Sequence, residues 1–118
     1  MRFFKVDPAK TNPKGATDVP DGTRGQLIKL CAELGLNVAA EIGVEQGKFS
    51  EEMFRVHPNL RLFCVDIWKS YGDYRQHVSD EKYEGFIDIV KSRLAGKDYE
   101  IVRGYSMDVV KDFPEGSL

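Results

Sequence analysis

The sequence predicts an α/β fold, because strand-like and helix-like segments alternate along the chain. Three short runs rich in branched and aromatic residues have the length of strands: Val38–Ile42, Arg61–Ile67 and Tyr99–Arg103. Each run is followed by a segment whose apolar residues recur at helical spacing. Right-handed crossovers would lay such strands side by side as a parallel sheet, with helices on its faces. The first run is apolar on both faces, which is typical of a central strand.

The helices are predicted from their apolar faces and from the residues at their ends. A leading helix from Arg24 to Leu34 has Thr23 as a candidate N-cap and Gly35 just after its end. Its inner face would carry Leu27, Ile28, Cys31 and Leu34. The next helix would have Phe49, Met53 and Val56 on its inner face. A third helix, capped by Ser79 or Asp80, would have an inner face of Tyr83, Phe86, Ile87, Val90 and Leu94. A short last helix is predicted over Met107–Phe113.

The chain divides into an irregular N-terminal arm and one domain. Residues 1–22 hold three of the five prolines, with one possible short strand at Arg2–Val6. Residues 23–118 carry the alternating pattern.

Composition excludes several function classes. The 118 residues have a formal net charge of −2 and no basic run, so no nucleic-acid partner is expected. No apolar stretch approaches the roughly 20 residues of a membrane helix, so no membrane partner is expected. Cys31 and Cys64 each lie in an apolar pattern, which favours two buried thiols over a disulfide or a metal pair. A cytoplasmic protein without a metal site is therefore predicted.

Polar signals follow all three predicted strands at the end where a parallel sheet binds ligands. The first is Glu41-x-Gly43-x-x-x-Gly47, a glycine turn leading into a helix. Gly43 would let the backbone approach a ligand, and Gly47 would let the helix pack near the strand. By itself this pattern also fits an ordinary tight turn.

The second and third signals agree with the first in position. Asp66 ends the second strand, where packing does not require an acid, and it can accept two ribose hydroxyls. Trp68 after it, and the pair Tyr105-Ser106 after the third strand, can border a purine. We interpret the three signals together as a nucleoside-cofactor site.

The charge of the first turn indicates which cofactor. The dinucleotide pattern G-x-G-x-x-G does not fit, since Glu41 occupies its first glycine position and no glycine stands at its third, while Glu45 adds a second acid to the turn. Carboxylates would repel a pyrophosphate and attract an ammonium and a sulfonium. S-adenosylmethionine is therefore favoured over NAD.

These residues resemble class I S-adenosylmethionine-dependent methyltransferases. The likeness is greatest to a small-molecule branch with the motifs E-I-G-V-x-x-G-x-F-S, here Glu41–Ser50, and V-D-x-W, here Val65–Trp68. It runs from about residue 24 to the last residue. It implies a Rossmann-like, three-layer methyltransferase fold, of which the first three parallel strands and flanking helices are present. Leu118 would then stand before the fourth strand, so residues 23–118 would be the N-terminal half of the domain.

The resemblance also implies roles for single residues. Glu41 and Gly43 would contact the methionine part of the cofactor, with Ser50 near its carboxylate. Asp66 would hold the ribose hydroxyls. The remaining contacts would be Ile67 and Trp68 along the adenosine, and Tyr105 and Ser106 at the adenine.

Three functions stay open for such a chain. The first is methyl transfer to a small-molecule acceptor, which would need the rest of the domain or a partner. The second is a cofactor-binding remnant without catalysis, and the third is an NAD-type nucleotide-binding protein. The first strand would be an apolar sheet edge, which a homo-oligomer can complete. Two interpretations stay open for the aromatic residues Trp68, Tyr71 and Tyr74, which either line the ligand or are partly exposed on the surface. His57 is interpreted as a surface residue or a helix-end residue, and His77 as a residue of a solvated loop.

Overall fold

The computed structural model describes residues 22–70 and 78–118, and these form an α/β unit. Its three strands make one parallel sheet in the order β1-β2-β3, which confirms the predicted fold class. The candidate strand Arg2–Val6 and the loop residues Tyr71, Tyr74 and His77 lie outside the described residues. The elements are α1 (Arg24–Glu33), β1 (Val38–Ile42), α2 (Lys48–Val56), β2 (Arg61–Asp66), α3 (Asp80–Arg93), β3 (Tyr99–Arg103), α4 (Ser106–Val109) and η2 (Val110–Asp112).

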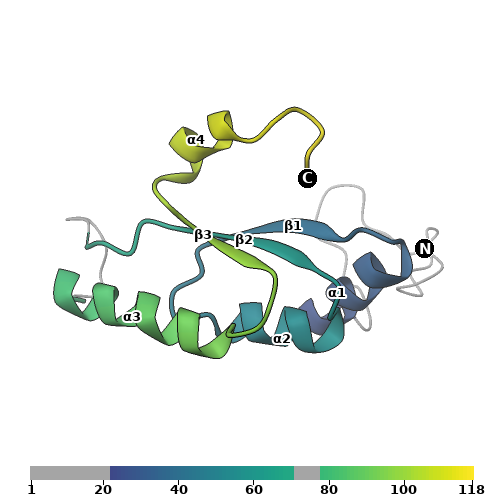
Figure 1. The fold of residues 1–118 in the computed structure, drawn as a ribbon, viewed down its shortest axis with the longest axis horizontal. Helices are drawn as coiled ribbons and strands as arrows, with labels where there is room; N and C mark the ends of the chain where they lie inside the picture. Colours follow the sequence, from purple (N-terminus) through teal and green to yellow (C-terminus); the bar gives the residue numbers. More distant parts are fainter. Residues whose placement is uncertain (1–21, 71–77) are drawn as a thin grey trace, which may run out of the picture.

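The helices cover the sheet unequally. Figure 1 shows α1, α2 and α3 along one side of the sheet, and α4 with the C-terminal segment on the other. Helix α2 packs between α1 and α3. The hydrophobic core lies between this helical layer and the sheet. Its buried members are Val44, Met53, Phe54, Leu60, Leu62, Cys64, Trp68, Phe86, Ile87, Val90 and Leu94.

Local signals placed the helix ends well. The Thr23 hydroxyl accepts a hydrogen bond from the Gln26 amide at 3.2 Å, so Thr23 is the N-cap of α1. Gly35, with φ of +71°, ends α1 by directing the amide of Leu36 back to the Cys31 carbonyl at 2.9 Å. Ser79 caps α3 in the same way as Thr23 caps α1.

Three predicted boundaries differ from the structure by small amounts. Strand β2 ends at Asp66 rather than Ile67, because the chain turns there and the Trp68 amide bonds back to the Asp66 side chain. Helix α1 ends at Glu33, with Leu34 as its C-cap. The last helical stretch starts at Ser106 and changes to a 3-10 turn at Val110.

Within the described residues Val38–Ile42 is an edge strand, which confirms the expected apolar sheet edge, although its apolar pattern is typical of a central strand. Strand β2 occupies the centre, and its Leu62 and Cys64 are fully buried. Strand β1 lies at the edge, where Ile42 is 61% exposed. A run of small and branched apolar residues therefore did not by itself separate an edge strand from a central one.

The inner face was predicted correctly for α3 and only in part for α1, where Ile28 packs against the core but Leu34 is exposed. Phe86, Ile87, Val90 and Leu94 are buried as expected. In α1, no residue is fully buried, and Leu27 is 51% exposed. In α2, the sequence interpretation missed Phe54, which is 1% exposed.

Candidate functional site

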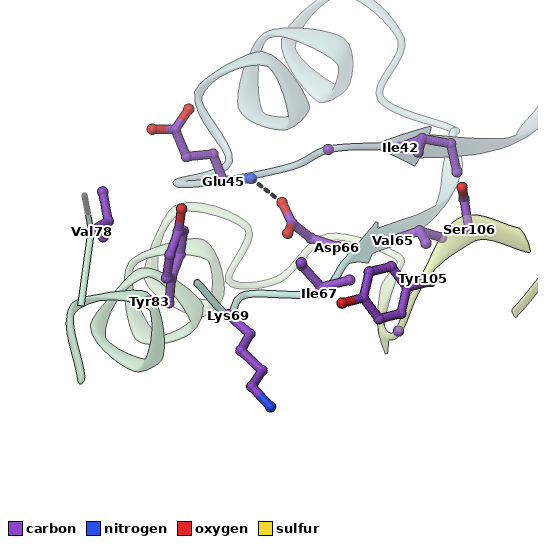
Figure 2. A pocket seen from close by; sticks show the side chains of 12 residues that line it. Ile42, Glu45, Val65, Asp66, Ile67, Lys69, Val78, Tyr83, Tyr105 and Ser106 are labelled. Carbon is purple, nitrogen blue, oxygen red and sulfur yellow. Dashed lines mark hydrogen bonds between the residues drawn. The ribbon is translucent and has the colours of Figure 1, made fainter. Parts of the chain in front are cut away.

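The C-terminal ends of the three strands meet around one hollow. The parallel register sets Ile42 beside Val65 and Asp66 beside Arg103, so the three loops that follow leave the sheet at one edge. The hollow measures about 530 Å³, within the size range of small-molecule sites. Figure 2 shows its lining, which comprises Ile42, Gly43, Glu45, Val65, Asp66, Ile67, Lys69, Val78, Tyr83, Gly104, Tyr105 and Ser106.

The glycine turn after β1 is built from positive backbone angles. Gly43 has φ of +83°, and a Cβ there would meet no atom within 4 Å. The backbone at Gly43 is therefore open to the hollow, as the sequence predicted. Glu45 also has a positive φ, +57°, which is uncommon for a residue with a side chain.

Gly47 has a different packing role from the predicted one. Its φ is +77°, and a Cβ there would lie 3.2 Å from Cγ2 of Val90 in α3. The close approach is thus between the start of α2 and α3, not between a helix and a strand. Gly47 therefore allows the start of α2 to pack closely on α3, and it does not line the larger hollow.

Asp66 has a structural task that the sequence did not reveal. Its Oδ2 accepts from the Glu45 amide at 2.8 Å, and its Oδ1 accepts from the Trp68 amide at 2.9 Å. Figure 2 shows the bond to Glu45 at the wall of the hollow. The expectation that no packing reason places an acid there is therefore wrong. A carboxylate has about four acceptor positions, so about two stay open to a ligand.

Trp68 lies in the core and not on the wall of the hollow. Its side chain is fully buried, and its indole N–H donates to the Glu45 carbonyl at 2.8 Å. Its φ is +42°, a strained value for a bulky residue. Trp68 therefore acts on the site through the glycine turn, while Ile67 before it lines the hollow.

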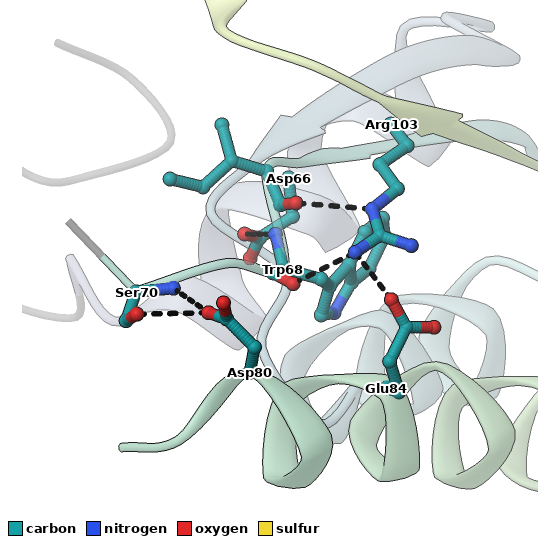
Figure 3. A network of polar contacts seen from close by, with 7 residues as sticks. Asp66, Trp68, Ser70, Asp80, Glu84 and Arg103 are labelled. Carbon is teal, nitrogen blue, oxygen red and sulfur yellow. Dashed lines mark hydrogen bonds and ion pairs between the residues drawn. The ribbon is translucent and has the colours of Figure 1, made fainter. Parts of the chain in front are cut away.

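A polar network fixes the turn that follows Asp66. Arg103 donates to the carbonyls of Ile67 and Trp68 at 3.2 and 3.1 Å and pairs with Glu84 of α3 at 2.5 Å, as Figure 3 shows. On the other side, Asp80 accepts from the amide and hydroxyl of Ser70, each at 2.8 Å.

These contacts also affect Asp80 itself. The hydrogen bonds from the Ser70 amide and then from its hydroxyl hold the pKa of Asp80 below its ordinary value. The turn therefore keeps its shape through contacts with β3 and α3, and no local sequence pattern indicates these contacts.

Glu41 lies on the helix-covered side of the sheet. Its strand partner is Cys64, and the buried Ser50 of α2 donates its hydroxyl to the Glu41 carboxylate. Burial is the main cause that raises the pKa of Glu41, and the Ser50 hydrogen bond and the charge of Arg24 oppose it. Ser50 is 0% exposed, so its hydroxyl supports Glu41 from within the core.

Glu41 lines a second, smaller hollow of about 260 Å³. Its walls also include Arg24, Val44, Gln46, Lys48 and Phe49. Both hollows include Gly43 and Glu45, so the glycine turn is a common wall of the two. The arrangement suits a ligand that passes over Gly43 with one part in each hollow.

The turn after β3 supplies the remaining predicted residues. Tyr105, 58% exposed, and Ser106 both line the larger hollow. A side chain at Gly104 would force Val109 to shift, because a Cβ would lie 2.7 Å from its Cγ1. The sequence interpretation did not assign Lys69 or Tyr83 to the hollow. Tyr83 had a signal, since its position on the inner face of α3 directs it toward the sheet.

Cys64 and His57 are both buried and have structural roles. Burial, and secondarily the charge of Glu41, raises the pKa of the Cys64 thiol to about 12, so it stays protonated near neutral pH. His57 caps the end of α2, as one of its two readings predicted. It is 5% exposed and contacts the Leu36 carbonyl through Nε2 at 3.1 Å, so the surface reading is wrong.

Two searches of the described residues gave negative results. Within residues 22–70 and 78–118, no group of three or more His, Cys, Asp or Glu side chains is arranged to hold a metal ion. None of the helices in the same ranges has the length and apolar character to cross a membrane.

Comparison with protein-family models, with curated proteins and with solved structures returned no match for this chain. The ligand of the site must therefore be inferred from the geometry and charge of the site itself.

Proposed function

We propose that this chain binds S-adenosylmethionine and forms the cofactor-binding part of a methyltransferase that acts on a small molecule. The observation that carries the proposal is the meeting of three strand ends around two adjoining hollows with a glycine turn between them. The parallel three-strand sheet with flanking helices is compatible with the Rossmann-like fold that the motifs imply.

The residues present fit the two ends of that cofactor. In the larger hollow, the open acceptor positions of Asp66 suit ribose hydroxyls, with Ile67 and Tyr105 beside the adenosine. In the smaller hollow, Glu41 suits the ammonium of the methionine part. When bound, the sulfonium of the cofactor supplies the methyl group that is transferred.

Charge separates this ligand from a dinucleotide. Glu45 lines both hollows, and Glu41 and Asp66 line one each, while Lys69 lines the larger hollow and Arg24 and Lys48 line the smaller one. This mixed lining suits a ligand with charges of both signs, such as an amino acid joined to a sulfonium, better than a pyrophosphate, which is purely anionic and would be repelled by the carboxylates. NAD is the competing ligand that this argument disfavours.

Titration calorimetry of the whole chain tests the proposal. S-adenosylmethionine and S-adenosylhomocysteine should each release or absorb heat with a saturating isotherm, and NAD should not. The homocysteine form should bind at least as well as methylthioadenosine. Binding of NAD without binding of either S-adenosylmethionine or S-adenosylhomocysteine would overturn the proposal. It would also be overturned if the chain bound none of these three compounds.

A further inference from the structure

Arg24 is a candidate ligand-binding residue outside every motif that the sequence displayed. It is the first residue of α1, and its guanidinium lies over the Phe49 ring with 5.3 Å to the centroid. Both residues line the smaller hollow. The Thr23 cap fixes the start of α1, and Gly25 lies so near α2 that a Cβ would be 3.2 Å from Oε1 of Glu52. The start of α1, which carries Arg24, therefore lies close to α2 at the hollow.

The smaller hollow has charges of both signs. Its positive side chains are Arg24 and Lys48, and its negative side chains are Glu41 and Glu45. Burial raises the pKa of Glu41, and the positive charge of Arg24 acts in the opposite direction after the Ser50 hydrogen bond, so the two side chains attract each other. A purely anionic or purely cationic ligand would leave one sign uncompensated, whereas a zwitterion satisfies both. An arginine fork matches a carboxylate with two parallel hydrogen bonds.

We propose that Arg24 binds the carboxylate of an α-amino-acid head group in the smaller hollow while Glu41 binds its ammonium. The pair would then select adenosyl ligands that carry a complete amino acid. The inference rests on the proposed function for the adenosyl part of the ligand, and it adds the residue that determines specificity at the other end.

Three ligands that share the thioadenosine part and differ in the group attached to its sulfur provide the test. S-adenosylhomocysteine has both charges, its decarboxylated form has the ammonium alone, and methylthioadenosine has neither. Calorimetry with the whole chain should give the tightest binding to the first. Loss of the carboxylate should weaken binding about 10- to 100-fold, the range expected for hydrogen bonds to a charged group.

Substitutions then assign the effect to residues. Arg24→Gln should bring S-adenosylhomocysteine to within about threefold of its decarboxylated form and leave methylthioadenosine affinity unchanged. Arg24→Lys should retain part of the preference. Glu41→Gln should instead reduce the difference between the decarboxylated form and methylthioadenosine. Arg55→Gln, the same change of charge on the exposed side of α2, should leave all three affinities as they are.

The outcomes separate this inference from the proposed function. If none of the three ligands binds, the proposed function fails. If the wild-type chain binds all three equally, the adenosyl site stands and the head-group site is overturned. If Arg24→Gln weakens all three alike, Arg24 has a structural role only. If Lys48→Gln and not Arg24→Gln removes the carboxylate preference, the assignment to Arg24 is wrong.

Discussion

Strands β1 and β2 each carry a carboxylate near the C-terminal end, and the two carboxylates are held in different ways. Asp66 accepts two backbone amides, one from the turn after each strand, so it connects the turns to each other. Glu41 has a side-chain partner, Ser50, and lies against the core on the helix-covered side of the sheet. The first carboxylate supports the architecture of the site, whereas the second is a polar group kept beside a hollow despite the cost of burial.

The largest expected effect comes from Asp66→Ala. Two hydrogen bonds to a charged acceptor are lost, so the free energy of unfolding should fall by about 2–3 kcal/mol. Loss of the ribose contact should weaken adenosyl binding by about 1–3 kcal/mol. Denaturant unfolding and calorimetry measure the two quantities.

Asp80→Ala is the matched control for this change. Asp80 also holds the turn after β2, through Ser70, but it does not line the larger hollow. Asp80→Ala should destabilise the turn without a comparable loss of affinity. Equal losses of affinity in both variants would mean that Asp66 acts only through the shape of the turn.

A smaller effect is expected from alanine at the two glycines of the first turn. Both have positive φ, which costs an alanine roughly 1–2 kcal/mol. Gly47→Ala should cost more, because its Cβ also presses on Val90, whereas Gly43→Ala enters open space. Gly43→Ala should instead weaken ligand binding more than Gly47→Ala does. The reverse order in either quantity would contradict the separation of the two glycines into packing and ligand access.

The third prediction concerns pH and Glu41. Because burial raises the Glu41 pKa in the folded state, the folded chain binds this proton more tightly than the unfolded chain does. The contribution of Glu41 to stability should therefore decline as pH rises from its ordinary value of 4.5 through the raised pKa. The stability difference between wild type and Glu41→Gln should change across that window. With the exposed Glu33→Gln as a control, a flat difference for Glu41→Gln would refute the burial argument.

The last prediction concerns the reactivity of the two thiols, and its measurement leaves the fold unchanged. Cys64 is fully buried with a pKa of about 12, whereas Cys31 is only partly buried. Near pH 8, a thiol reagent should modify Cys31 roughly a hundredfold or more faster than Cys64, since the thiolate is the reactive form. Cys31→Ser leaves Cys64 to be followed alone, and rapid labelling of that variant in the folded state would contradict its burial.

Local patterns predicted the elements of this chain because their causes are local. The Thr23 and Ser79 caps, the Gly35 helix end and the inner face of α3 depend on residues within a few positions of one another. The placement of Glu41, Asp66 and Tyr105 at strand ends follows from the same local reading once the strands are parallel. Sequence alone thus placed the candidate site at the edge of the sheet where the structure has the larger hollow.

What the tertiary structure decided depends on contacts between distant segments. It placed Trp68 in the core instead of on the wall, set Ser50 behind Glu41, and brought Gly47 against Val90 of another helix. It also brought Arg24 into the hollow beside Glu41. The pairs Ser50 with Glu41, Gly47 with Val90 and Arg24 with Glu41 each join different elements of the fold. No spacing rule within one helix or strand therefore predicts them. Periodicity tells which face of an element is apolar, but only packing determines which neighbour that face meets.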